Sequence, residues 1–292
     1  MPAQMLHALF GETVIESLSR MIGAGFRPYL EAARGDCQRV FVLGCQGPDI
    51  FYHSQMTRPV ALEYGTLLHR RGFGRFAAAL LAQTLTVPPR PAPLALYALG
   101  FMTHGLLDRA CHPYIVYKSS AMKAGAPGRY AGLSDGQAHA FFERILDALM
   151  LEALRGIAPS RWDQAALAEV CADPPAGLGE MLADTLARVF PERAGDDRKL
   201  SQRIPNALRD CAVFYRLTDP RNPGADAPPA CVYPSRLPLS VDYLNLRRGS
   251  WHYPVREGPA EDRSFPDIYR DAVLDGAARC YRFMAPSFKT RC

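Results

Sequence analysis

Histidine and carboxylate residues recur at helical spacing in the first half of the chain. Of the seven His in 292 residues, six precede residue 140. One segment places His104, Asp108 and His112 at intervals of four residues, and another places His139 and Glu143 at the same interval. Because four residues advance only about 40° beyond a full helical turn, such side chains project in one general direction. Imidazole and carboxylate groups so placed are suited to bind Zn²⁺, and one carboxylate can bridge two ions. The spacing therefore predicts a multi-metal site.

A single pair of His and carboxylate four residues apart is common in proteins without a metal. The prediction therefore depends on the recurrence of the pattern. Asp49 follows Gly47 and Pro48, and we expect it to enter the site from a loop. His53 lies four residues later and is a less favoured member of the cluster. Cys111 is expected to be a small buried residue rather than a ligand. Three further carboxylates are expected at the surface rather than as partners that orient the ligands: Glu12, Asp147 and Glu152.

The order of these motifs resembles the zinc-dependent phospholipase C family, whose helical architecture is shared with S1/P1-type nucleases. The resemblance covers residues 1–155 most strongly, and its most specific part is the block LGFMTHGLLDRACHP at residues 99–113. The family's ligand order, His, Asp, His, His-x3-Asp, His and His-x3-Glu, maps onto this chain as His7, Asp49, His69, His104, Asp108, His112, His139 and Glu143.

The resemblance implies how these ligands divide among the ions. One zinc ion is expected at the set formed by His112, His139 and Glu143. A second is expected at the set formed by Asp49, His69, His104 and Asp108. Asp108 is expected to bridge to a third ion near His7. In the family the third ion also uses an N-terminal Trp, whereas this chain begins Met-Pro, so two to three zinc ions per chain are expected.

The implied activity is hydrolysis of phosphate esters by a metal-bound hydroxide, with phospholipids favoured as substrates. Asp49 is the candidate catalytic residue, which steers or deprotonates the attacking water. Two alternatives stay open: an S1/P1-type nuclease or nucleotidase, and a zinc-binding relative without catalytic activity. A hydrolase built on a His-Asp dyad is excluded, because the chain contains no His-Asp dipeptide.

Composition limits the partners. Hydrophobic residues make up 48% and charged residues 22% of the chain, as in ordinary globular proteins. The net charge of +5 is small and evenly spread, so no nucleic-acid partner is expected. No apolar run reaches the roughly 20 residues of a membrane-spanning helix. The N-terminal segment lacks the pattern of a secretory signal, which predicts a cytoplasmic protein. The eight Cys are spread without a C-x-x-C motif, so no disulfide framework is expected.

The elements that must position these residues are predicted to be helices. Apolar residues follow helical spacing in seven segments: 5–21, 66–85, 94–111, 136–154, 163–170, 179–190 and 265–284. Three Pro-rich or Gly-rich joints separate them, at 87–93, 173–177 and 218–238. Residues 39–43 are a candidate short strand, and Pro113 predicts that its helix ends near His112. We therefore expect one all-α domain over residues 1–292 of the phospholipase C/P1 nuclease type. Its metal-binding core spans about 1–155, and a C-terminal region of helices and irregular, Pro-rich loops, 156–292, packs on it.

Overall fold

The computed structural model describes residues 4–84, 92–125, 132–234, 237–238, 240–255 and 258–289. Within these ranges the chain forms helices and turns with no β-strand, and Trp251 and Glu261 form an isolated antiparallel bridge. The all-α prediction is confirmed. The proline-rich joint at 87–93 lies largely outside the described residues, as do Met1 and Pro2, on which the expectation for a third ion depended.

The α-helices have these bounds: α1 (Gln4–Ile22), α2 (Arg27–Arg34), α3 (Gln38–Cys45), α4 (Asp49–Tyr52), α5 (Leu62–Arg70), α6 (Phe73–Thr84), α7 (Pro93–Gly125), α8 (Asp135–Arg155), α9 (Gln164–Ala172), α10 (Leu178–Val189), α11 (Leu200–Leu217) and α12 (Phe265–Lys289). Short 3₁₀ or π turns occur at Ala24–Phe26, Pro159–Arg161, Pro191–Gly195 and Pro229–Cys231.

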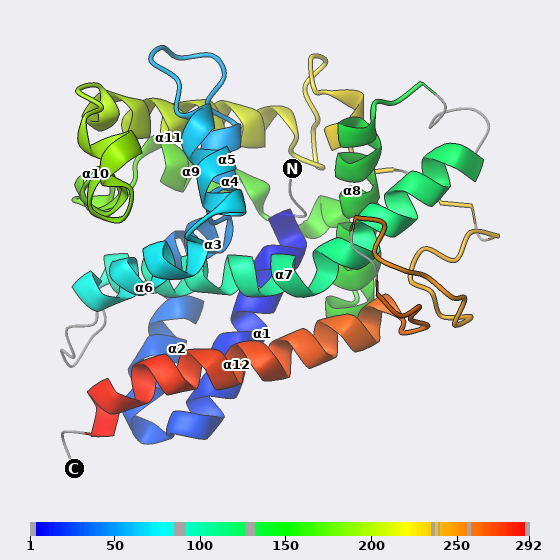
Figure 1. The fold of residues 1–292 in the computed structure, drawn as a ribbon, viewed down its shortest axis with the longest axis horizontal. Helices are drawn as coiled ribbons and strands as arrows, with labels where there is room; N and C mark the ends of the chain where they lie inside the picture. The colour runs from blue at the N-terminus through cyan, green and yellow to red at the C-terminus, as the bar shows by residue number, and fades with distance from the viewer. Residues whose placement is uncertain are drawn as a thin grey trace.

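Helix α7 runs through the middle of the molecule, and α1, α3, α6, α8 and α12 pack against it (Figure 1). The contact with α3 is a backbone contact, because a Cβ added to Gly44 would lie 2.2 Å from the carbonyl oxygen of Tyr97. Only glycine permits this approach. Phe41 and Phe101 are fully buried beside it. The crossing of α3 and α7 therefore fixes the position of the α7 residues that lie one turn further along, where the site begins.

The prediction that Pro113 ends its helix is wrong, since α7 spans 33 residues and contains Pro113 in its interior. Proline removes one backbone hydrogen bond, but the residues beyond it are held by tertiary contacts. Tyr114 is fully buried, donates a hydrogen bond to the carbonyl of Tyr243 at 2.6 Å, and packs edge-on against Trp251. His112 consequently lies inside a continuous helix rather than at its end.

Three other local predictions differ from the structure. Residues 39–43 belong to α3 rather than to a strand, because this short apolar segment packs along α7 and α9. The segment 66–85 is divided into α5 and α6 at Gly72, whose φ of 75° breaks the helix. Helix α11 was not among the predicted segments, and it packs against α9 and α4. The helices α1, α8, α9, α10 and α12 match the predicted segments to within a few residues at most ends.

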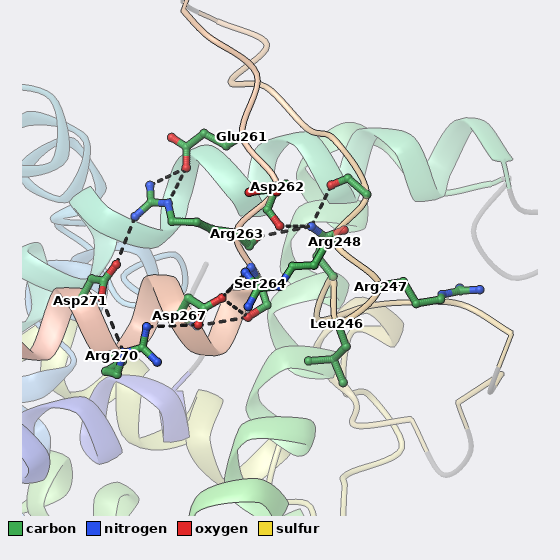
Figure 2. Close-up of polar contacts among 12 residues, drawn as sticks. Leu246, Arg247, Arg248, Glu261, Asp262, Arg263, Ser264, Asp267, Arg270 and Asp271 are labelled. Carbon is green, nitrogen blue, oxygen red and sulfur yellow. Dashed lines mark hydrogen bonds and ion pairs between the residues drawn. The ribbon is translucent and has the colours of Figure 1, made fainter.

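The loop before α12 is held onto the helix by a polar network (Figure 2). Ser264 and Asp267 exchange backbone-to-side-chain hydrogen bonds at the start of α12, which satisfies two backbone amides there. Arg263 joins the loop residue Glu261 at 2.5 Å to Asp271 of α12 at 3.5 Å. These contacts fix the loop that carries Tyr253 beside α7.

The seven described cysteines are all free. None of the described helices combines the length and apolarity needed to cross a bilayer.

Candidate metal centre

A cavity of about 980 Å³ opens between α4, α5, α6, α7, α8 and α12. Six of the eight predicted ligands line it: Asp49, His69, Asp108, His112, His139 and Glu143. The other two, His7 and His104, are 4% and 1% exposed and lie beneath Asp108. The structure therefore brings all eight residues to one cavity and its floor, although they come from five helices.

Asp49, His69 and His104 form one compact group whose ligand atoms lie within 4.8 Å of one another. Nε2 of His69 is 3.1 Å from one oxygen of Asp49, and Nε2 of His104 is 3.8 Å from the other. The opposite nitrogens, Nδ1, face the backbone carbonyls of Gly65 at 2.8 Å and of Cys45 at 3.1 Å. A carbonyl can only accept a hydrogen bond, so each Nδ1 carries a proton and each Nε2 is directed to the site.

His7, His104 and Asp108 form the second compact group. The two oxygens of Asp108 face different rings: Oδ1 lies 3.4 Å from Nε2 of His7, and Oδ2 lies 3.3 Å from Nε2 of His104. Oδ2 also lies 3.7 Å from Nε2 of His69. Asp108 thus joins the two groups, which is the bridging position that the family resemblance implied for it.

The electrostatics of the two groups favour a bound cation. Burial opposes the charge of Asp108, but the neighbouring His104 and His7 overcome it and hold the pKa of Asp108 well below its usual range. Burial likewise opposes the charge of Asp49, and His104 and His69 lower its pKa. Despite burial, Asp108 and Asp49 raise the pKa of His104 to about 9. Asp49, which is buried, and Asp108, which is 32% exposed, therefore stay ionised beside imidazoles that hold a proton, and a metal ion can replace that proton.

The donor set fits a divalent metal such as Zn²⁺. Nε2 of His104 is buried, and within the described residues it forms no hydrogen bond of good geometry. This nitrogen faces Asp108 at 3.3 Å without good hydrogen-bond geometry, and an ion at this point would satisfy it more fully. His104 offers this one nitrogen, because Nδ1 is occupied by Cys45. The two compact groups share it, so they describe adjacent positions around one shared ligand rather than two independent complete sites.

The third implied set lies at the same cavity but is less compact. Nε2 of His139 is 3.1 Å from Oε1 of Glu143, and the rings of His112 and His139 have centroids 4.9 Å apart. In the described part of the chain, only the two groups above bring three ligand atoms within 4.8 Å of one another. A metal ion at His112, His139 and Glu143 requires these side chains to move closer together.

The backbone of the segment that contains Gly47 and Pro48 also helps to fix the ring of His104. Gly47 has a φ of 55°, and a Cβ on it would lie 2.3 Å from Cγ of His104. The backbone therefore packs directly on the imidazole. Asp49 is not in a loop, as the sequence suggested, but is the first residue of the short helix α4. It still reaches the site from a different direction than the ligands of α7.

One carboxylate expected at the surface is fully buried and supports the site. Asp147 accepts hydrogen bonds from the backbone amides of Met5 at 3.3 Å and Leu6 at 2.8 Å and from the hydroxyl of Tyr233 at 2.7 Å. It therefore satisfies free amides at the start of α1, one residue before His7. Asp147 lies one helical turn beyond Glu143, and this shared face was the available signal in the sequence.

Several other side chains near the site lie outside the ligand groups. His53 stacks on Phe214 with centroids 3.8 Å apart and belongs to neither compact group. Cys111 is buried, as expected, and is not a member of either group. Glu12 pairs with Arg155 at 2.7 Å near the surface. Tyr52 stacks on His69 with centroids 4.8 Å apart and lines the cavity.

Four cavity residues that carry charged or hydroxyl groups were not singled out from the sequence: Arg70, Arg109, Tyr253 and Arg279. Two of them directly follow predicted ligands in the chain, since Arg70 follows His69 and Arg109 follows Asp108. This adjacency in the sequence could have indicated that both arginines lie near the site. Tyr253 and Arg279 reach the cavity from the C-terminal region, and no local pattern connects them to it.

Comparison with protein-family models, with curated proteins and with solved structures gives no significant match for this chain. The geometry and chemistry of the cavity therefore carry the functional assignment.

Proposed function

We propose that this protein is a zinc-dependent hydrolase of phosphate esters, with the phospholipase C/P1 nuclease type of helical fold. One observation carries the proposal. At the floor of a large cavity, His69 and His104 are each fixed through Nδ1 by a backbone carbonyl, and each directs Nε2 at Asp49 and Asp108. Such an arrangement of imidazoles and carboxylates is typical of catalytic metal sites.

The two compact groups support the ligand sets that the family resemblance implies. Asp49, His69, His104 and Asp108 would hold one ion, and Asp108 would also reach a further ion at His7. A last ion would use His112, His139 and Glu143. When bound, zinc supplies a Lewis acid that polarises phosphoryl oxygens and lowers the pKa of water. The three carboxylates of the cavity offset only part of the charge of two or three divalent ions. The remaining positive charge favours an anionic phosphate ester and the charge that develops in its transition state.

The protein's own residues supply position and proton transfer. In the hydrolysis, a water oxygen bonds to phosphorus, the ester P–O bond breaks, and the alcohol leaves with a proton. Asp49 is the group we assign to receive the proton of the attacking water, because it is 3% exposed and faces the cavity from α4. Its oxygens also face the nitrogens of His69 and His104, so a ligand role and a base role overlap in this side chain.

Phospholipids are the substrate class that the family resemblance favours, and the cavity wall supports an ester with an apolar part. Leu68, Met102 and Leu106 line the cavity together with Phe73 and Ala77. Apolar side chains of this kind can contact the glycerol and the first acyl carbons of a short-chain lipid.

The test combines metal content with activity. Purified protein is analysed for bound zinc and then assayed on dihexanoyl phosphatidylcholine, on dihexanoyl phosphatidate, on p-nitrophenyl phosphate and on single-stranded DNA, with zinc and after chelation. We expect bound zinc and chelation-sensitive release of phosphate or phosphorylated headgroup. Activity on DNA alone moves the assignment to the nuclease branch. Bound zinc without activity on any of the four favours a non-catalytic zinc protein. Absence of zinc in the folded protein contradicts the proposal.

A further inference from the structure

Three arginines line the cavity that holds the candidate metal ligands: Arg70 at the end of α5, Arg109 on α7 and Arg279 on α12. They come from three different helices, and none of these residues belongs to the ligand set. Guanidinium groups bind carboxylates and phosphates. At a site for phosphate esters, these arginines are therefore candidates to bind an anionic group of the substrate.

The direction of Arg109 is fixed by the helix that carries it. Seven residues of α7 line the cavity, and four of them lie three or four residues before or after Arg109: Gly105, Leu106, His112 and Pro113. These positions share one side of a helix. Arg109 therefore lies on the same face as the candidate ligands of α7 and one turn from His112.

The three arginines differ in how they are held. Arg279 pairs with Asp275, one turn earlier on α12, at 2.6 Å. Within the described ranges, neither Arg70 nor Arg109 forms an ion pair with a carboxylate, and both side chains are exposed. Arg70 and Arg109 are thus available to a ligand, and Arg279 is held in place by its neighbour.

The carboxylates that line the cavity do not neutralise Arg70 and Arg109, whereas Arg279 is paired with Asp275. Among the described lining residues, the carboxylates are Asp49, Asp108 and Glu143, and all three are candidate metal ligands. Bound ions would offset their negative charge. Arg70 and Arg109 would then add positive charge to the cavity, and they would repel a cationic headgroup such as choline.

We propose that Arg70, Arg109 and Arg279 form an anion-binding subsite that selects phosphate esters carrying a second negatively charged group beside the scissile phosphate. This inference rests on the proposed function and specifies its substrate class. The shared chemistry is a phosphate ester with an additional anionic group or charge, whether it is the headgroup of an acidic lipid or a soluble organic phosphate. Zwitterionic choline esters are the disfavoured class.

A binding experiment tests the subsite without turnover. Three phosphonates resist hydrolysis and differ in the second group: phosphonoacetate carries a carboxylate, ethylphosphonate carries none, and 2-aminoethylphosphonate carries an ammonium group. Calorimetry on the zinc-loaded protein is expected to rank their affinities in that order. Replacement of Arg70 or Arg109 by Gln should weaken phosphonoacetate roughly tenfold, the worth of one charge-assisted hydrogen bond. Binding of 2-aminoethylphosphonate should change less than about twofold, because the lost charge does not attract its ammonium group.

The matched control is Arg188→Gln, which removes the same charge from an exposed position of α10 outside the cavity. We expect it to leave all three affinities unchanged. Equal binding of the three phosphonates to the wild type overturns the inference. So does an equal loss of all three in the arginine variants, which would mean that the arginines bind the phosphonate itself.

Turnover assays distinguish the two possible sources of the anion, an acidic lipid and a soluble organic phosphate. Hydrolysis of dihexanoyl phosphatidylinositol 4-phosphate, whose headgroup carries a second phosphate, in preference to the phosphatidylcholine identifies an acidic lipid, whereas preference for 2-phosphoglycolate, which carries a carboxylate, over both lipids identifies a soluble phosphate. Either result supports the subsite, and preference for the phosphatidylcholine overturns it. Failure of all substrates with zinc bound contradicts the proposed function, while the phosphonate affinities still report separately on the arginines.

Discussion

The imidazole rings of His7 and His104 stack with centroids 4.0 Å apart and 13° between their planes, although they belong to α1 and α7. Two buried imidazoles at this distance do not both hold a positive charge. Burial and the nearby His104 lower the pKa of His7, whereas two carboxylates raise the pKa of His104 against the effect of burial. The stacked pair therefore offers one neutral imidazole and one site where a proton and a metal ion compete.

Replacement of Asp108 by Asn should remove metal binding from both compact groups. Its two oxygens face His7 and His104, so the substitution affects both. We expect zinc affinity to fall by more than roughly 100-fold, beyond the loss from removing an outer hydrogen-bond partner. Competition with a fluorescent chelator measures it, and Asp135→Asn, at an exposed carboxylate of α8, is the control. Unchanged affinity would remove Asp108 from the ligand set.

Replacement of Asp49 by Asn separates its two assigned roles. An amide keeps one oxygen for a metal ion but does not accept the proton of water. We expect zinc to be retained and kcat to fall by about 10²–10⁴, the usual contribution of a general base. Metal analysis and steady-state kinetics are measured on the same sample. Loss of zinc in proportion to activity would show that Asp49 is only a ligand, and full activity with zinc retained would show that Asp49 is not the base.

Gly47→Ala should disturb His104 without changing any ligand. Its φ of 55° disfavours a side chain, and the new Cβ would lie 2.3 Å from the ring. We expect the free energy of unfolding to fall by about 1–3 kcal/mol and the zinc content to drop. Urea denaturation and metal analysis measure the two effects. Gly179→Ala is the control, because nothing lies within 4 Å of the added Cβ. A variant as stable as the wild type and with full zinc would contradict this packing.

Asp147→Asn should loosen the start of α1. The amide nitrogen of Asn cannot accept the hydrogen bonds that the second carboxylate oxygen receives from Met5 and Tyr233. Leaving such buried donors without a partner costs about 1–3 kcal/mol. We expect that loss of stability in chemical denaturation, together with weaker zinc binding through displacement of His7. Asp184→Asn on the exposed side of α10 should change neither quantity. Equal stability of the two variants would exclude an anchoring role for Asp147.

His53→Phe should make the protein more resistant to acid. Burial lowers the pKa of His53 to about 3, and both ring nitrogens are buried without a hydrogen bond in the described part of the chain. The unfolded chain takes up this proton near pH 6.5. The neutral ring therefore stabilises the fold above pH 6.5, and that contribution is lost as the pH falls toward 3.

Phe keeps the stacking on Phe214 and does not titrate. Between pH 7 and pH 4.5 the metal-free wild type should lose about 2 kcal/mol more of its free energy of unfolding than the variant. Urea denaturation at the two pH values measures this difference. Identical losses in the two proteins would mean that His53 does not contribute to acid unfolding.

Much of the helical framework could be predicted from the sequence because helical periodicity is local. The apolar residues of α1 and α8 repeat at the helical interval, and Ser134 marks the start of α8 with a capping box. The errors occurred where distant contacts override local signals. Pro113 does not end α7, because Tyr114 beyond it is anchored by Tyr243 and Trp251.

The sequence by itself determined the types of candidate ligand and their helical phase, because residues four apart on one helix face share a direction whatever surrounds them. Only the tertiary structure decided which ring nitrogen faces the cavity. It also decided that Asp108 lies between His7 and His104, and that Asp147 is buried. The choice of nitrogen depends on the backbone carbonyls of Gly65 and Cys45. The relations that depend on residues far apart in the chain, including the approach of Arg279 from α12, are set by helix packing, which no local spacing encodes.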